Sequence, residues 1–150
     1  MISLKKGTLG IISGVSILCP VKPKATNLIL IACKNRTFQN VIDIFKLAKR
    51  DLNEILSAFE FMDTESMKSV KENLKLDNPF KLDTVCDFYC LAETHGSCDE
   101  HDKAKIETFY SSLVKAKLST DAIIAENDTQ FKYIWSLRER LAEALKHDGV

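Results

Sequence analysis

The chain has 150 residues, of which 45% are hydrophobic and 28% are charged, and its basic and acidic side chains balance to a formal net charge of zero. These values are typical of a single globular domain with an ordinary core. A balanced charge lacks the positive field that nucleic-acid binding requires, so the totals argue against a nucleic-acid partner.

The first 33 residues differ in charge from the rest of the chain. They contain four lysines and no acidic residue, and the first carboxylate is that of Asp43. Lys5 and Lys6 precede the apolar run 8–19, which is too short to span a bilayer but suits the hydrophobic region of a signal peptide. This pattern predicts a cleaved leader or a membrane anchor.

Two other interpretations of this segment remain open. Residues 30–33 (LIAC) resemble the short box at which bacterial lipoproteins are processed, where a thiol receives the lipid. Alternatively, residues 9–18 and 27–33 are of strand length and rich in Ile and Leu, so they could pair as a short buried hairpin. The predicted organisation is therefore a leader, anchor or strand pair over 1–33 and a folded domain over 34–150.

From residue 37 onward, apolar residues recur at helical spacing. Thr37 is a suitable N-cap. The seam that follows predicts one long helix as far as residue 62, and it consists of Val41, Phe45, Ala48, Leu52, Ile55, Phe59 and Met62. Asp63 or Thr64 would cap a short helix that continues through Leu74.

The remaining helices are predicted from start and stop signals. The Asn-Pro pair at 78–79 would begin a buried helix, which Gly96 would end in the left-handed conformation. Residues 97–100 form a capping box for the next helix, and the last helix would begin at 119–120. The predicted fold class is thus all-α, an up-down bundle of four long helices plus one short helix.

Residues 86–101 hold three of the five cysteines and two of the three histidines. Zinc in proteins is bound by four Cys or His ligands at comparable spacings. Cys90, His95, Cys98 and His101 would all lie near the tip of the predicted helical hairpin. A zinc site at this tip is therefore one hypothesis.

Disulfide bonds are the competing interpretation of the same cysteines. Cys90 and Cys98 would flank the predicted turn on antiparallel helices, within the reach of a bridge, and Cys33 could then reach Cys86. Removal of a leader would take Cys19 away and leave an even number of cysteines. In a reducing compartment, all five would remain thiols.

The sequence contains no G-x-S-x-G, P-loop, H-E-x-x-H or EF-hand motif. Trp135 and Tyr133, with Arg138 one turn away, are candidate interface residues. The sequence therefore predicts a non-enzymatic module without a cofactor, periplasmic or secreted, that binds another protein as an inhibitor, a toxin-neutralising partner or a secretion accessory. The alternative is a cytoplasmic α-helical regulatory or structural protein with the zinc site.

Overall fold

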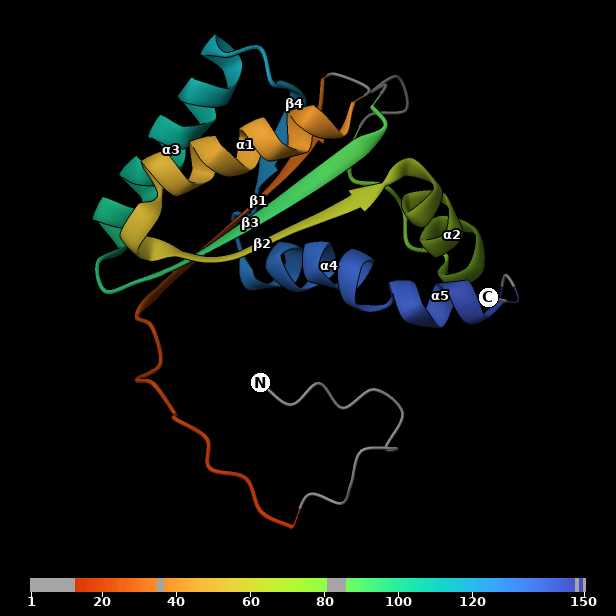
Figure 1. Ribbon diagram of the computed structural model, residues 1–150, viewed down its shortest axis with the longest axis horizontal. Helices are drawn as coiled ribbons and strands as arrows, with labels where there is room; N and C mark the ends of the chain where they lie inside the picture. Colours follow the sequence, from red (N-terminus) through yellow and green to blue (C-terminus); the bar gives the residue numbers. More distant parts are fainter. Residues whose placement is uncertain (1–12, 35–36, 81–85, 148, 150) are drawn as a thin grey trace.

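The protein is described by a computed structural model for residues 13–34, 37–80, 86–147 and 149. Within these ranges the chain forms one four-stranded antiparallel sheet with helices on both faces (Figure 1). The predicted all-α bundle is therefore wrong. The elements in chain order are β1 (Ala25–Cys33), α1 (Phe38–Asp51), β2 (Leu56–Asp63), α2 (Thr64–Leu74), β3 (Phe88–Gly96), α3 (Asp99–Lys115), β4 (Ser119–Ile124), α4 (Asp128–Glu139) and α5 (Leu141–His147).

The spatial order of the strands is β2-β3-β1-β4, so β1 lies inside the sheet. It pairs with β3 from Ala25 opposite Gly96 onward, and with β4 from Ile29 opposite Ile124 onward. The side chains of residues 28–33 are completely buried. The apolar run that resembles a lipoprotein box is thus an internal strand, and the boundary predicted after residue 33 would separate this strand from its partners.

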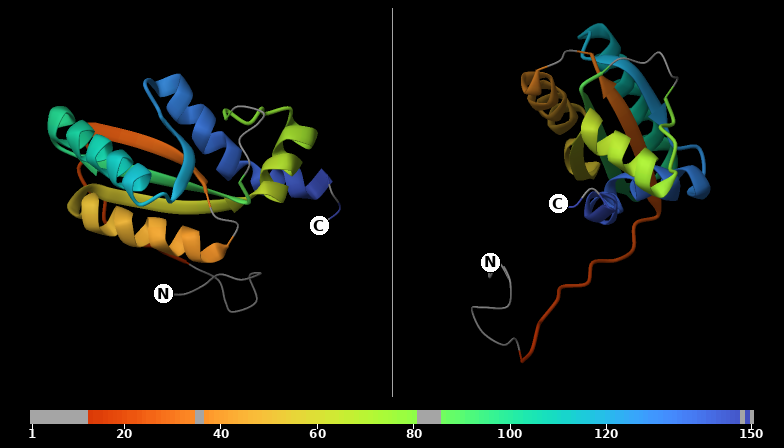
Figure 2. Two further views of the ribbon diagram at one scale, coloured as in Figure 1. Left: turned by 90° about the horizontal axis from the view of Figure 1, so that it is seen from above. Right: turned by 90° about the vertical axis from the view of Figure 1, so that its right-hand side faces the viewer.

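The first of the two proposed strands, residues 9–18, does not form in the part that the structure describes. Residues 13–18 are exposed and have no regular structure, and residues 9–12 lie outside the described residues. Figure 2 shows the extended segment that begins at residue 13 leaving the body of the fold before β1 starts. None of the described helices is long and apolar enough to cross a membrane.

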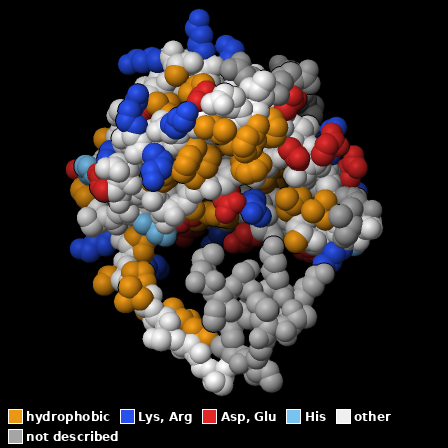
Figure 3. All heavy atoms as spheres, viewed as in Figure 1, with side chains coloured by type: hydrophobic (Ala, Val, Ile, Leu, Met, Phe, Trp, Pro, Cys, Tyr) orange, Lys and Arg blue, Asp and Glu red, His pale blue; other side chains and the backbone are white. Residues whose placement is uncertain are grey.

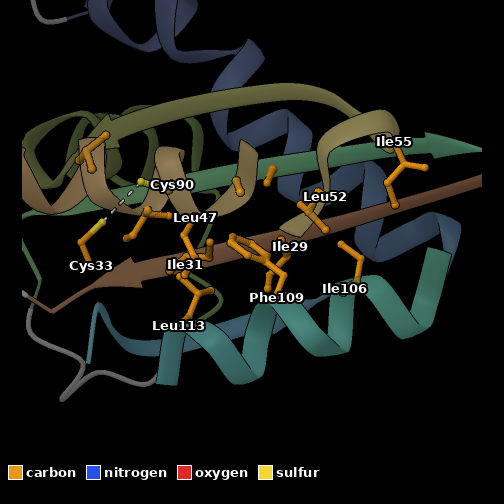
Figure 4. Close-up of a cluster of buried hydrophobic side chains, with 14 residues drawn as sticks. Ile29, Ile31, Cys33, Leu47, Leu52, Ile55, Cys90, Ile106, Phe109 and Leu113 are labelled. Carbon is orange, nitrogen blue, oxygen red and sulfur yellow. Dashed lines mark hydrogen bonds between the residues drawn. The ribbon is translucent and has the colours of Figure 1, made fainter. Parts of the chain in front are cut away.

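Side chains alternate between the two faces of the sheet and build two cores. One core lies under α1 and α3 (Figure 4) and includes Ile29, Ile31, Ile44, Leu52, Phe109 and Leu113. The other lies against α2, α4 and α5 and includes Leu28, Leu30, Tyr89, Leu91, Ile134 and Leu137. Each fully buried Leu or Ile contributes about 1.5–3 kcal/mol to folding, so both layers are needed for stability.

The long helix predicted from 37 to 62 ends early. Thr37 is the N-cap as expected, but α1 stops at Asp51. Asn53 then adopts a positive φ of 27°, and a short 3-10 turn (Asn53–Ile55) leads into β2. The short helix predicted after Asp63 is confirmed as α2, where the Asp63 side chain accepts a hydrogen bond from Ser66 N at 2.7 Å.

The buried helix predicted from 78–79 to Gly96 is wrong, because its second half is strand β3. The helix predicted from 119–120 is also wrong at its start, where β4 forms first. α4 begins only at Asp128, and the Asn127 side chain caps it by accepting from Gln130 N. β3 is buried over most of its length and therefore lacks the exposed polar stripe of a surface helix, whereas β4 is a half-buried edge strand.

Candidate functional site

A group of polar side chains lies on the face of β2 and β3 that is turned toward α4. Glu60 of β2 is opposite Leu91, and Glu93 of β3 is opposite Ala58, so both glutamates share the face on which Leu91 packs under α4. Arg138 reaches this face from α4. Together with Ser57 and His95, these residues are called the sheet-face site below.

Ser57 belongs to the site because of an irregularity in the sheet. The register between β2 and β3 shifts between Leu56 and Ala58, which leaves Ser57 as an extra residue in β2. Such bulges re-aim side chains, often beside functional sites. Here the Ser57 hydroxyl is brought to 2.9 Å from Nδ1 of His95.

His95 is held at both ring nitrogens. Nε2 makes a short contact with Oε1 of Glu93, two residues earlier on the same face of β3. A carboxylate can only accept, so we assign the ring hydrogen to Nε2, and the neutral ring then accepts the Ser57 hydroxyl at Nδ1. Glu93 is buried, whereas the His95 side chain is 41% exposed. The arrangement is a serine, a histidine and a carboxylate in series, open to solvent at the histidine.

Arg138 supplies the positive charge of the site. Its Nε and Nη2 atoms lie 3.1 and 3.0 Å from the same carboxylate oxygen of Glu60, Oε2. Both side chains are somewhat more than one third exposed. The guanidinium is thus positioned by Glu60 and remains open to a second anion, because only two of its five N–H groups are needed for this contact.

A cavity of about 400 Å³ lies between β3 and α4, beside these residues. It is lined by Glu93, Phe131, Lys132, Trp135 and Glu139. The lining combines an aromatic wall with one cation, Lys132, and two carboxylates, Glu93 and Glu139. An apolar carbon skeleton fits against Trp135, whereas a carboxylate group would have to lie toward Lys132 and away from the two glutamates. The sheet-face site adds Arg138 and a histidine held by Glu93 beside this cavity.

The predicted zinc ligands do not come together. His95 lies in the sheet-face site, but Cys90 points into the core on the opposite face. Cys98 is the N-cap of α3, and His101 instead contacts Asp102 at 2.9 Å. Among the described residues no group of three or more His, Cys, Asp or Glu side chains could hold a metal ion, so the zinc alternative is wrong.

The cysteines are arranged differently from the predicted disulfide pairs. Cys33 and Cys90 lie side by side on β1 and β3, with their sulfur atoms 3.5 Å apart (Figure 4), and both are free thiols. Cys90 is separated from Cys98 by the length of β3, so the hairpin on which that pair was based does not form. The hydrogen bond to Cys33 and burial raise the pKa of Cys90, and burial raises the pKa of Cys86.

The three candidate interface residues all lie on α4. Trp135 lines the 400 Å³ cavity and Arg138 pairs with Glu60. The Tyr133 hydroxyl donates to the carbonyl of Asp77 at 2.6 Å, which ties α4 to the segment after α2.

Ser57, Glu60 and Glu93 were not predicted. The signal that could have identified Glu93 is its spacing from His95, because residues two apart share a face only in a strand. In a helix, which was predicted here, the same two residues do not face each other.

Three curated relatives match this chain over 144 residues, or 96% of its length. They are D-2-hydroxyglutarate dehydrogenase, mitochondrial, of Danio rerio at 45% identity, the enzyme of the same name from Rattus norvegicus at 42%, and D-2-hydroxyglutarate–pyruvate transhydrogenase of Saccharomyces cerevisiae at 39%. The matched region is 26%, 26% and 28% of these proteins, so the chain spans about a quarter of their length.

These relatives overturn two predictions. The prediction of a non-enzymatic binding module is wrong, because relatives with 39–45% identity over nearly the whole chain are named as enzymes. The predicted periplasmic or secreted location is wrong, because the fish and rat relatives are named as mitochondrial. The cytoplasmic alternative is wrong for the same reason.

The matched family is described as FAD linked oxidases, C-terminal domain, and the match covers residues 22–150. The prediction of a protein without a cofactor is therefore wrong, because FAD is the cofactor for which the family is named. The match includes β1, which is consistent with the position of this strand inside the sheet. The chain belongs to the family of FAD-linked oxidase C-terminal domains.

Proposed function

We propose that this chain forms the substrate-binding side of a mitochondrial FAD-linked dehydrogenase that oxidises a D-2-hydroxy acid, with D-2-hydroxyglutarate as the first substrate to test. The names of the relatives support the reaction class and the substrate. The observation that carries the proposal is the position of Arg138, an open guanidinium on the same sheet face as a carboxylate-held histidine.

The turn between β3 and α3 does not form a cradle for the diphosphate of FAD. Such a cradle needs backbone N–H groups at a helix N-terminus and no competing negative charge. The strand-to-helix turn after Gly96 has the required position, but the first turn of α3 carries Asp99, Glu100 and Asp102. These three carboxylates would repel a diphosphate, so no step of the reaction is assigned here through FAD.

Arg138 would bind the carboxylate of the hydroxy acid. A charge-assisted pair of N–H···O bonds from a guanidinium is strong and directional. Glu60 would keep the guanidinium oriented toward the sheet face while the substrate occupies its remaining N–H groups. The carbon chain would pack on Trp135 in the adjoining cavity, where Lys132 offers a second cation.

His95 would accept the proton that the substrate hydroxyl loses when the alcohol becomes a ketone. Its Nδ1 is the acceptor nitrogen of the neutral ring, and the Ser57 hydroxyl donates to it at 2.9 Å. The proton would pass through the Ser57 hydroxyl, which gives its own proton to Nδ1 as it takes the proton of the substrate. Glu93 would stabilise the resulting imidazolium through Nε2.

The experiment uses the complete FAD-loaded protein that carries this chain, with dye reduction as the assay and D-2-hydroxyglutarate, its L enantiomer and D-lactate as substrates. Arg138→Leu should lower kcat/KM for D-2-hydroxyglutarate about 100-fold, because it removes a charge-assisted hydrogen-bond pair. Arg140→Leu is the matched control, since Arg140 pairs with Glu143 on the next helix, and it should change kcat/KM less than about 2-fold.

His95→Asn should lower kcat about 100-fold or more, because it removes the proton acceptor. Equal effects of the two arginine substitutions, or no turnover of any 2-hydroxy acid by the wild-type protein, would contradict the proposal.

A further inference from the structure

An exposed aromatic patch covers the junction of α1 and β2. Phe38, Phe45 and Phe61 are 46%, 41% and 48% exposed. Phe38 packs edge-on against Phe61 and Phe88 with ring centroids 5.1 and 5.9 Å apart, and Phe45 lies 5.0 Å from Phe59. Figure 3 shows hydrophobic side chains gathered at the centre of this face. These five residues are called the phenylalanine patch below, and a contiguous apolar surface of this kind marks an interaction site.

The patch adjoins an open edge of the sheet. β2 is the first strand in the order β2-β3-β1-β4, and no described strand pairs with its outer side. Exposed edges are normally protected by lysine, proline or covering segments. β2 reads LSAFEFMD and contains neither lysine nor proline. Its unpaired N–H and C=O groups are therefore available to another strand.

The two ends of the patch carry opposite charge. α1 runs antiparallel to β2, because Phe38 contacts Phe61 near the end of the strand and Phe45 contacts Phe59 nearer its start. Lys46 and Lys49, in the second half of α1, thus lie toward the start of β2, whereas Asp63 ends the strand and Glu65 follows it. Lys46 also pairs with Asp43 and Glu65 with Lys68, and both are exposed pairs that contribute little and can exchange partners. In Figure 3, Lys and Arg side chains flank the patch on one side, and Asp and Glu side chains flank it on the other.

We propose that the edge of β2 and the phenylalanine patch form an isologous interface with a second copy of this chain. In this dimer, β2 pairs antiparallel with β2 of the other copy around a two-fold axis perpendicular to the sheet. The rotation keeps both α1 helices on the same face, so the two phenylalanine patches become continuous. It also reverses the strand, which places the basic end of one patch on the acidic end of the other. The polarity of the charges is what favours a second copy, because an antiparallel copy complements it without any further partner.

The first experiment measures the association of the full chain by sedimentation equilibrium. The wild-type chain should dimerise. Phe61→Lys should weaken the dimer at least about thirtyfold, because it places a charge at the centre of the apolar interface. Val114→Lys is the matched control, since Val114 is 54% exposed on α3, away from the patch, and it should leave the dissociation constant unchanged.

The second experiment exchanges the charges. Lys49→Glu alone and Glu65→Lys alone should each weaken the dimer about fivefold, and the double variant should restore wild-type affinity. Hydrogen exchange should also slow in β2 as the protein concentration rises, because pairing protects its outward N–H groups.

A chain that stays monomeric up to millimolar concentration would overturn the proposal and leave the patch to a different occupant, such as another domain. A dimer that is insensitive to Phe61→Lys, or a charge exchange that does not restore affinity, would also overturn it.

Discussion

The carboxylate of Asp102 packs directly on Gly96 across the turn between β3 and α3. A Cβ atom added to Gly96 would lie 1.8 Å from Asp102 Oδ2. Asp102 is 1% exposed, so its side chain has little room to move away. Its Oδ1 is 2.9 Å from His101 Nδ1, whereas Oδ2 has no hydrogen-bond partner among the described residues. The close approach explains why residue 96 is glycine although its φ is not in the left-handed region.

Gly96→Ala should therefore lower the free energy of unfolding by about 1–3 kcal/mol, the usual effect of overpacking a closed site. Urea unfolding measures it. Gly14→Ala is the control, because nothing lies within 4 Å of the Cβ position there, and it should have no measurable effect. Combining Gly96→Ala with Asp102→Ala should cost less than the sum of the two single changes, since the second removes the clash. Strict additivity would show that the contact is not the cause.

The internal position of β1 predicts a sharp difference between two shortened chains. Deletion of residues 1–21 removes exposed or undescribed segments and should shift Tm by no more than a few degrees. Deletion of residues 1–33 removes the strand between β3 and β4 and should abolish cooperative unfolding. Circular dichroism during heating distinguishes the two. A cooperative transition in the shorter chain would mean that the sheet can close without β1.

The cysteines should divide into two groups by reactivity. Cys19 and Cys98 are exposed, whereas Cys33, Cys86 and Cys90 are buried. Because burial and the contact with Cys33 raise the pKa of Cys90, its reactive thiolate is depleted further. A thiol reagent at neutral pH should label Cys19 and Cys98 rapidly, and the other three only after denaturation. Peptide mapping identifies the sites, and rapid labelling of Cys90 in the native protein would be inconsistent with this core.

Tyr89 should be the last tyrosine to ionise. Burial, together with the neighbouring Cys86 thiol, raises the pKa of Tyr89 to about 12, although the hydrogen bond from Asn78 opposes the shift. A raised pKa in the folded state means that the unfolded chain loses this proton first. The stabilisation is complete below the unfolded pKa near 10, and up to about 3 kcal/mol is lost as pH rises toward 12.

Absorbance at 295 nm follows this ionisation. Tyr89→Phe should remove the most alkaline step and flatten stability between pH 10 and 12. An unchanged titration curve would assign the step to Tyr133, whose pKa burial also raises.

The sequence predicted elements well where local chemistry decides them. The cap at Asp63 and the helix after it are correct, because side-chain capping acts within one turn. The helix predicted to begin at residues 97–100 is also present, as α3 (Asp99–Lys115). Its N-cap is Cys98 and not the predicted residue 97. Both are surface helices whose polar and apolar sides are distinct.

Residues 27–33, which were one of the two proposed strands, lie in β1, but β2, β3 and β4 were missed. In β3, burial on both faces removes the alternation that identifies a strand. β3 is buried over most of its length, so Tyr89, Cys90, Leu91 and Ala92 fit a buried helix equally well. Ile55 in the 3-10 turn and Phe59 and Met62 in β2 continued the helical spacing of α1 by coincidence, although the turn at Asn53 separates them from that helix. The sheet-face site could not be predicted without these strands, since Glu60, Glu93 and His95 meet only through their register.

The position of β1 also has a consequence for synthesis on the ribosome. Among the described strands β1 is translated first, and its neighbours β3 and β4 follow only at residues 88–96 and 119–124. Until both have emerged, the most apolar strand of the fold has no partner on either side. Such late, non-local pairing slows folding and exposes the nascent strand to aggregation. The newly made chain should therefore depend on a holding chaperone that recognises residues 28–33 until β4 has left the exit tunnel.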